Sequence, residues 1–246
     1  MSFSGGLFTR EQAEALVASH PRWYHRFEIF PGVLTPGVYD PSGVLASLEL
    51  PDDLHGRRVL EIGPADGYFT KQLALRGAKV TAFDYVARDF LGFAIMEKLH
   101  GAHFDFVQGN LFDLPKFDFP PFDLVLCMGV LYHLPDMVRG LHLLRDACAG
   151  RLILETLIAT DLGEEPRARY HPAASLNNDP TNFWSPNLAC VRSMLTDVGF
   201  VLERHGNLGQ QDQSSGRAVF WCRKSTPETK RTKTDIAYSQ RTGSRA

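Results

Sequence analysis

Short apolar runs alternate with helical patterns through the middle of this 246-residue chain, and this alternation restricts its fold more than any other feature. The strands expected from it are 58–62 (RVLEI), 79–83 (KVTAF), 104–107 (FDFV), 123–128 (DLVLCM) and 151–156 (RLILET), with helices at 67–76, 87–99 and 137–147. Strands that are apolar throughout are buried on both faces, as in a parallel sheet between two layers of helices. The pattern therefore predicts an α/β fold with a Rossmann-like, doubly wound sheet.

The C-terminal part completes the sheet. Residues 160–188 are irregular and polar and resemble an insertion, and a helix is expected at 187–198. Strands near 200–206 and 217–223 follow, and they would pair as a hairpin at one edge. The full prediction is a seven-stranded, mostly parallel sheet with helices on both faces. Residues 225–246 are polar and lack periodicity, so they are expected to be disordered.

A helix and a proline-rich segment precede Arg58. Residues 9–19 have an amphipathic pattern, with Thr9 at the N-cap and Gln12 at the capping-box position. Residues 21–56 hold five prolines and several aromatic residues, which favours a structured loop or lid over a regular element. The expected organisation is an N-terminal helix and lid (1–57), an α/β domain (58–224) and a disordered tail (225–246).

Composition limits the environment and the partners. Hydrophobic residues make up 44% of the chain, enough for a sizeable core. The four cysteines form no CxxC pair, so neither a zinc site nor a disulfide framework is predicted. Without an apolar signal or spanning stretch, a cytoplasmic protein with no membrane partner is expected. The formal net charge is −2, and because the segment from Ser225 onward is basic, the rest is more negative. This balance disfavours nucleic acid as a partner but does not exclude it.

The stretch VLEIGPADGYFT, residues 59–70, should carry a strand into a glycine-containing turn and then a helix. Ligands of open parallel sheets bind at the carboxyl ends of the strands, where this turn lies. A dinucleotide fingerprint counted from Gly63 would need two further glycines, where Ala65 and Tyr68 stand instead. What remains is an acid and two glycines, Glu61, Gly63 and Gly67. An ordinary strand-to-helix turn is the alternative interpretation.

This arrangement resembles motif I of the class I S-adenosylmethionine (SAM) methyltransferases, and two later strand ends fit the same family. The resemblance implies SAM as the cofactor, with glycines that let the backbone approach it closely. The residues that would bind it are Glu61 for the ammonium group, Gly63 and Gly67 in the turn, Asp84 for the ribose hydroxyls, Asn110 for the adenine amino group, Leu111 beside the ring, and Met128 beneath the sulfonium. Many family members have Asp where this chain has Asn110.

A narrower resemblance begins in the fourth expected strand. FDLVLCMGVLYHLPD (122–136), LETL (154–157), Arg169-Tyr170, NFWSPN (182–187) and VGF (198–200) together resemble the tRNA wobble-uridine carboxymethyltransferase group and its shorter small-molecule relatives. Tyr132 matches a tyrosine that contacts a carboxylated SAM in that group. The lysines that the group also uses are missing, because the chain before Arg58 contains no lysine. Ordinary SAM and methyl transfer are therefore expected.

Two histidines and Tyr132 are the candidate catalytic residues. A hydroxyl acceptor must lose a proton, and His133, just after the fourth strand, or His25, in the lid, could accept it. His133 could instead have a structural role in the turn before Pro135. No metal site is predicted, because the end of the fourth strand offers Met128 rather than a carboxylate.

Aromatic residues are concentrated in the lid and in the insertion. They are Trp23, Tyr24, Phe27, Phe30, Phe183 and Trp184. These residues either pack together or line a pocket for a partly apolar, drug-sized molecule. The leading hypothesis is a SAM-dependent methyltransferase that modifies a hydroxyl of a small molecule held between 23–38 and 160–188. The alternatives are a tRNA-modifying (carboxy)methyltransferase acting on wobble uridine and a non-catalytic SAM-binding protein. The acceptor, the methylated atom and the oligomeric state stay open.

Overall fold

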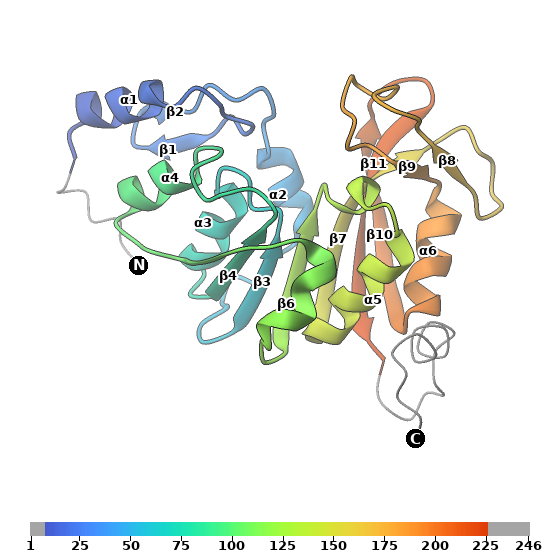
Figure 1. Cartoon of the computed structure of the whole chain (residues 1–246). Coiled ribbons are helices and arrows are strands. Elements are labelled where there is room, and N and C mark those ends of the chain that lie inside the picture. The colour runs from blue at the N-terminus through green and yellow to red at the C-terminus, as the bar shows by residue number, and fades with distance from the viewer. Residues whose placement is uncertain (1–7, 226–246) are drawn as a thin grey trace. The chain divides into compact units, whose positions relative to one another are not determined.

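The computed structural model describes residues 8–225, which fall into two compact units divided between Asn110 and Leu111 (Figure 1). The predicted disordered tail lies outside the described residues except for Ser225. Seven strands make up the mostly parallel sheet, three in the first unit and four in the second. This confirms the α/β, Rossmann-like fold predicted from the alternating pattern. No helix within residues 8–225 is both long and apolar enough to cross a membrane.

The first unit opens with α1 (Arg10–Ser19), and its predicted cap is confirmed. The Thr9 hydroxyl accepts a hydrogen bond from the Gln12 N–H (3.2 Å), and the Gln12 side chain accepts one from the Thr9 N–H (2.8 Å). Such a cap stabilises a helix by about 1 kcal/mol. The helix buries Ala13 and Val17, four residues apart on one face.

The segment 21–56 is more regular than predicted. It forms a short antiparallel pair, β1 (Glu28–Phe30) and β2 (Val33–Leu34), and a helix, α2 (Ser42–Leu48). The turn between the strands has Gly32 at a φ of +74°, and its N–H donates to the Glu28 carboxylate. The expectation of no regular element was wrong because the prolines lie between the short elements and not inside them.

The parallel part of the first unit contains β3 (Arg58–Ile62), β4 (Lys79–Asp84) and β5 (Asp105–Gln108), hydrogen-bonded in that order. Two helices, α3 (Tyr68–Leu75) and α4 (Phe93–His100), connect these strands. The predicted start of the helix 87–99 was wrong, because α4 begins six residues later, at Phe93. Residues 87–92 form turns instead, because the Gly92 N–H bonds to the Asp66 carboxylate (2.9 Å) and not within a helix.

The second unit is built on β6 (Phe122–Met128), β7 (Cys148–Ala159), β11 (Ser215–Lys224) and β10 (Phe200–Gln210), paired in that order. β6 and β7 are parallel, and β10 and β11 form the predicted antiparallel hairpin at the edge. The remaining elements are η1 (Leu111–Phe117), η2 (Leu131–His133), α5 (Met137–Ala147), β8 (Ala168–Tyr170), β9 (Trp184–Pro186) and α6 (Leu188–Asp197). The insertion is thus mostly irregular, as predicted, apart from the β8–β9 pair.

The buried residues of β7 and α5 follow the patterns expected of a central strand and of a packed helix face. Residues 152–159 of β7 are all buried, which is the continuous apolar run expected of a central strand. The helix α5 buries Met137, Gly140, Leu141 and Leu144, the spacing of one helix face. β7 begins earlier than predicted, at Cys148, because its first residues already pair with β6.

Candidate active site

The predicted cofactor residues of the first unit lie at neighbouring strand ends. The Gly63 N–H donates to the Phe83 carbonyl (3.0 Å), and the Gly109 N–H donates to the Asp84 carbonyl (2.7 Å). These bonds connect the chain just after β3 to β4, and the chain just after β5 to β4. Asn110 follows directly and is exposed. The strand ends that the sequence analysis placed together are therefore adjacent in the structure.

The turn after β3 requires its glycines. Gly63 and Gly67 have φ values of +73° and +80°, a region that disfavours other residues. A Cβ on Gly67 would also lie 2.2 Å from the Met96 Cε and 3.0 Å from the Phe93 ring, so a larger residue would force these side chains to shift. Tyr68, which stands where a dinucleotide turn needs glycine, is buried against Phe27, with 5.1 Å between the two ring centres.

Glu61 is a carboxyl group buried in the first unit, with 1% of its surface exposed. It accepts a hydrogen bond from the Thr70 hydroxyl on α3. Burial raises the pKa of Glu61 to about 8, the Thr70 bond lowers it in part, and the nearby Asp84 charge raises it further. The carboxyl therefore keeps its proton near pH 7 until a positive charge comes close.

Asp84 ends β4 and is also buried, with 8% exposed. Burial raises its pKa, and backbone N–H groups of Val86, Tyr85 and Ala65 offset part of the shift. Ala65 belongs to the turn after β3 and has a φ of +50°. The turn and the acid at the end of β4 thus face each other, with acceptor oxygens available for hydroxyl groups.

Asp66 is a residue that the sequence analysis did not single out. It is fully buried within the turn, and its carboxylate accepts the N–H groups of Tyr24 (2.8 Å), His25 (2.6 Å) and Gly92 (2.9 Å). Burial raises its pKa, and these three bonds lower it in part. Asp66 therefore fixes the lid segment and the chain before α4 to the turn. Its position within the turn was the only sequence signal, because its partners are distant in the chain.

His25 lies in the interior of the first unit, with 4% exposed. Burial lowers its pKa to about 4, so the ring is neutral near pH 7. Its Nδ1 lies 3.6 Å from the Asp66 carboxylate and has no hydrogen-bond partner among the described residues. Tyr68 and Phe69 surround the ring at about 6 Å between ring centres. The catalytic role of His25 stays a prediction, and the structure shows a ring enclosed by aromatic neighbours.

The other candidate residues belong to the second unit. Leu111 is buried in η1, and Met128, half-buried, ends β6. The next residue, Gly129, has a φ of +68°, and its N–H donates to the Glu155 carbonyl (3.1 Å). This bond turns the chain sharply after β6 and leads it into η2, where Tyr132 and His133 lie.

Tyr132, Glu155 and Arg217 form a cluster across β7, β11 and η2. The Arg217 guanidinium donates from Nε and Nη2 to the two Glu155 carboxylate oxygens, the second at 2.9 Å. Its Nη1 lies 3.4 Å from the Tyr132 hydroxyl. Burial lowers the pKa of Arg217, but the Glu155 bonds and charge outweigh it, so the pKa is raised and the group stays charged. The sequence analysis missed Arg217, because it lies 85 residues beyond Tyr132 without a local signal.

His133 is half-buried and held by the insertion. Its Nδ1 lies 3.1 Å from the Thr181 carbonyl and 2.9 Å from the Thr181 hydroxyl. That hydroxyl donates to Asp179, so it can accept from the ring, and Nδ1 carries the proton. Burial lowers the pKa of His133, while Thr181 and Asp179 raise it in part. Nε2 is then the nitrogen with a free electron pair, as a general base requires.

No cluster of three or more potential metal ligands occurs within residues 8–225. Asn177 and Asn178, whose side-chain oxygens could in principle bind a cation, have φ values of +55° and +54° and are exposed turn residues.

Comparison with known proteins decides the family. Residues 42–205 match the sequence model of a family described as "Methyltransferase domain". The chain belongs to this family of methyltransferase domains. The family expected from the motifs is thus confirmed.

Curated relatives of this methyltransferase domain include proteins named tRNA U34 carboxymethyltransferase. The protein from Campylobacter hominis is 29% identical over 197 residues, covering 78% of this chain and 61% of the relative. The protein from Ruthia magnifica subsp. Calyptogena magnifica is 31% identical over 186 residues, covering 72% of this chain and 56% of the relative. The chain therefore spans about three fifths of the length of these relatives.

Solved structures share the fold of the methyltransferase domain. The N-terminal domain of EvdMO1 with bound S-adenosylhomocysteine (SAH) is 18% identical with a TM-score of 0.66, covering 88% of this chain and 98% of that one. Magnesium protoporphyrin IX methyltransferase from Synechocystis PCC 6803 with bound SAM is 22% identical with a TM-score of 0.54, covering 75% and 77%. At these identities the likeness establishes the fold.

Proposed function

We propose that the chain is a SAM-dependent methyltransferase that transfers a methyl group to a small-molecule acceptor, at a hydroxyl. The observation that carries the proposal is the buried, protonated Glu61 beside the buried Asp84, at adjacent strand ends of the first unit. Two buried carboxyl groups without a described cationic partner are costly to keep. A cationic ligand with hydroxyl groups would compensate that cost.

SAM fits the residues present in this site. Glu61 would lose its proton and bind the ammonium group, and Asp84 would accept hydrogen bonds from the two ribose hydroxyls. The side-chain oxygen of Asn110 would accept a hydrogen bond from the adenine amino group. The positive φ of Gly63 and Gly67 lets their backbone approach the ligand without a side chain between. Bound SAM supplies a methyl group on a positively charged sulfur.

His133 would remove the acceptor proton. Its Nδ1 proton is held by Thr181, so Nε2 takes the proton as the acceptor oxygen bonds to the methyl carbon. The lowered pKa keeps the ring neutral near pH 7. The alternative structural role of His133, as an anchor for the insertion through Thr181, uses the same bond. Kinetics of a His133 variant separate the two roles.

Incubation of the purified chain with metabolite extract and methyl-labelled SAM tests the proposed function. We expect label in a small molecule at an oxygen, and much less of it when Asp84→Ala replaces the wild type at a SAM concentration that does not saturate the variant. Asp52→Asn, an exposed acid outside the site, is the matched control and should transfer label normally. SAM binding without transfer to any extract component, RNA included, would instead support a non-catalytic SAM-binding protein.

A tRNA-modifying carboxymethyltransferase is the second candidate, and Arg217 favours it. The guanidinium lies beside Tyr132, the residue that resembles a contact to carboxylated SAM. It is a cation that the sequence analysis had not found near that tyrosine. Against this candidate, Glu155 already pairs with Arg217, and residues 1–57 contain no lysine. Competition calorimetry with SAM and carboxylated SAM discriminates the two, because the first proposal requires the tighter binding of SAM.

A further inference from the structure

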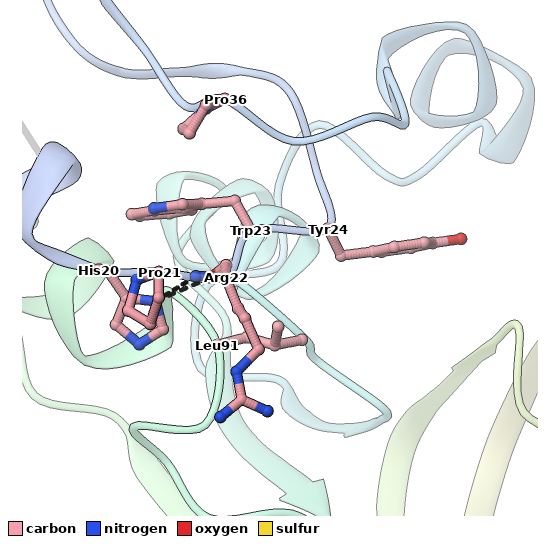
Figure 2. A pocket seen from close by; sticks show the side chains of 7 residues that line it. All are labelled: His20, Pro21, Arg22, Trp23, Tyr24, Pro36 and Leu91. Carbon is pink, nitrogen blue, oxygen red and sulfur yellow. Dashed lines mark hydrogen bonds between the residues drawn. The ribbon is translucent and has the colours of Figure 1, made fainter.

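The lid segment of the first unit forms an open pocket with a volume of about 550 Å³ (Figure 2). It is lined mainly by His20, Arg22, Trp23, Tyr24, Pro36 and Leu91. Figure 2 shows the Trp23 and Tyr24 rings pointing in opposite directions from one stretch of chain. The volume lies in the range of small-molecule sites, roughly 300–1,000 Å³.

The Trp23 and His20 rings of this pocket make hydrogen bonds within the protein. The Trp23 Nε1–H donates to the Val17 carbonyl (3.2 Å). Both His20 ring nitrogens lie within hydrogen-bond distance of backbone carbonyls, Nδ1 of Arg22 (2.8 Å) and Nε2 of Asp89 (3.0 Å). With its N–H engaged in this way, the Trp23 indole offers a ligand apolar ring surface. A flat aromatic group matches such a surface best.

Arg22 gives the pocket its charge. It is exposed, and its guanidinium lies 4.4 Å from the centre of the Phe90 ring. None of the ion pairs found within residues 8–225 involves Arg22. Arg22 is the only Arg, Lys, Asp or Glu among the described lining residues, and it makes the pocket complementary to an anion and unfavourable for a cation.

The pocket walls are fixed to the cofactor turn. Asp66, between Gly63 and Gly67, accepts the N–H groups of both Tyr24 and Gly92. Trp23 packs directly on Gly92, since a Cβ there would lie 2.0 Å from the indole. A buried carboxylate with three backbone donors holds these segments in a defined geometry, as a binding site requires.

We propose that this pocket binds a flat, negatively charged aromatic group of the methyl acceptor, such as an aromatic carboxylate. The inference rests on the proposed function and specifies its substrate class. The Trp23 indole contacts the ring of the ligand, and Arg22 pairs with its anionic group. Asp66 is a positioning residue that holds the pocket walls in a fixed position relative to the turn between Gly63 and Gly67.

Calorimetric titration of the full chain, saturated with SAH, with 2-naphthoate tests the proposal. We expect saturable binding with a Kd of about 1 mM or below. The uncharged 2-naphthalenemethanol should bind at least roughly tenfold more weakly, because it lacks the charge-assisted hydrogen bond. Arg22→Gln should weaken naphthoate by a similar factor and leave naphthalenemethanol unchanged. Arg26→Gln, an exposed arginine on the same segment outside the pocket, is the matched control and should bind both as the wild type does.

Several results would overturn the proposal. They are the absence of saturable naphthoate binding, equal affinity for both probes, and an Arg22→Gln variant with unchanged naphthoate affinity. If Arg22→Gln weakens tRNA binding while naphthoate fails to bind, the occupant is nucleic acid and the small-molecule assignment is wrong. The SAH titration that precedes the experiment separates the two levels. A chain that binds SAH but not naphthoate contradicts only this inference, whereas a chain that binds no SAH contradicts the proposed function.

Discussion

The Thr70 hydroxyl, in the first turn of α3, donates a hydrogen bond to the Glu61 carboxyl, near the end of β3. Both side chains are buried, and the pKa of Glu61 is raised to about 8, mainly by burial. Burial disfavours the carboxylate form at this strand end, and the Thr70 bond offsets part of that cost. Burial thus leaves Glu61 protonated near pH 7 in the proposed cofactor site before any ligand binds.

A His133→Ala variant should lose catalytic rate by roughly a hundredfold or more while SAM affinity stays unchanged. The wild-type rate should fall as the pH drops through a pKa below 6.5, because burial lowers the pKa of His133 and only the neutral ring accepts a proton. Single-turnover rates from pH 5 to 8 measure both effects. If the variant keeps full rate, His133 has only the structural role of anchoring the insertion.

Breaking the Glu155–Arg217 pair should destabilise the second unit strongly. Their side chains are 4% and 15% exposed, so Glu155→Ala leaves an unpaired charge in the interior and should cost about 3 kcal/mol or more. The double variant with Arg217→Met should recover part of this loss. Urea unfolding of the single variants and the double variant measures the free energies of this double-mutant cycle.

The exposed pair of Arg151 and Glu203 provides the control for that cycle. Glu203→Ala should change the free energy of unfolding by less than about 1 kcal/mol, because solvent screens this pair. Equal losses for Glu155→Ala and Glu203→Ala would contradict the interpretation of Arg217 as a desolvated cation.

His25 should make the stability of the first unit depend on pH. Its pKa is about 4 in the folded chain and about 6.5 when unfolded, so between these values the unfolded chain binds the extra proton. Stability from this residue is therefore present above pH 6.5 and lost as the pH falls toward 4. His25→Phe, which keeps a ring, should reduce the loss between pH 7 and 4.5 by about 2 kcal/mol. Identical pH profiles of unfolding would show that the ring is not buried as a neutral group.

Local patterns predicted most of the fold. The capping box of α1, the bounds of β3 and the helix α5 each depend on residues close together in the chain, so the sequence indicated them correctly. The start of α4 was wrong because Gly92 bonds to Asp66, 26 residues earlier. Tertiary contacts of this kind override helix propensity and leave no periodic signal.

The candidate site was predictable to a similar extent. Glu61 and Asp84 stand at strand ends, where position alone indicates a role. Arg217 and Asp66 were missed because their significance comes from partners on distant elements. Gly129 illustrates the same limit, since a Cβ at its position would lie 3.3 Å from the Arg217 guanidinium, a contact that pairing of β7 with β11 creates.

Calorimetric titration with SAM at pH 7, in two buffers of different ionisation enthalpy, tests the central claim most directly. If Glu61 loses its proton to pair with the ammonium group, the wild type should bind SAM and release on the order of one proton, as a pKa of about 8 requires. Glu61→Gln should bind at least roughly tenfold more weakly and without that release, and Asp84→Ala should weaken SAM by a similar factor. Failure of the wild type to bind SAM, or the same affinity and proton release in Glu61→Gln, would contradict the account.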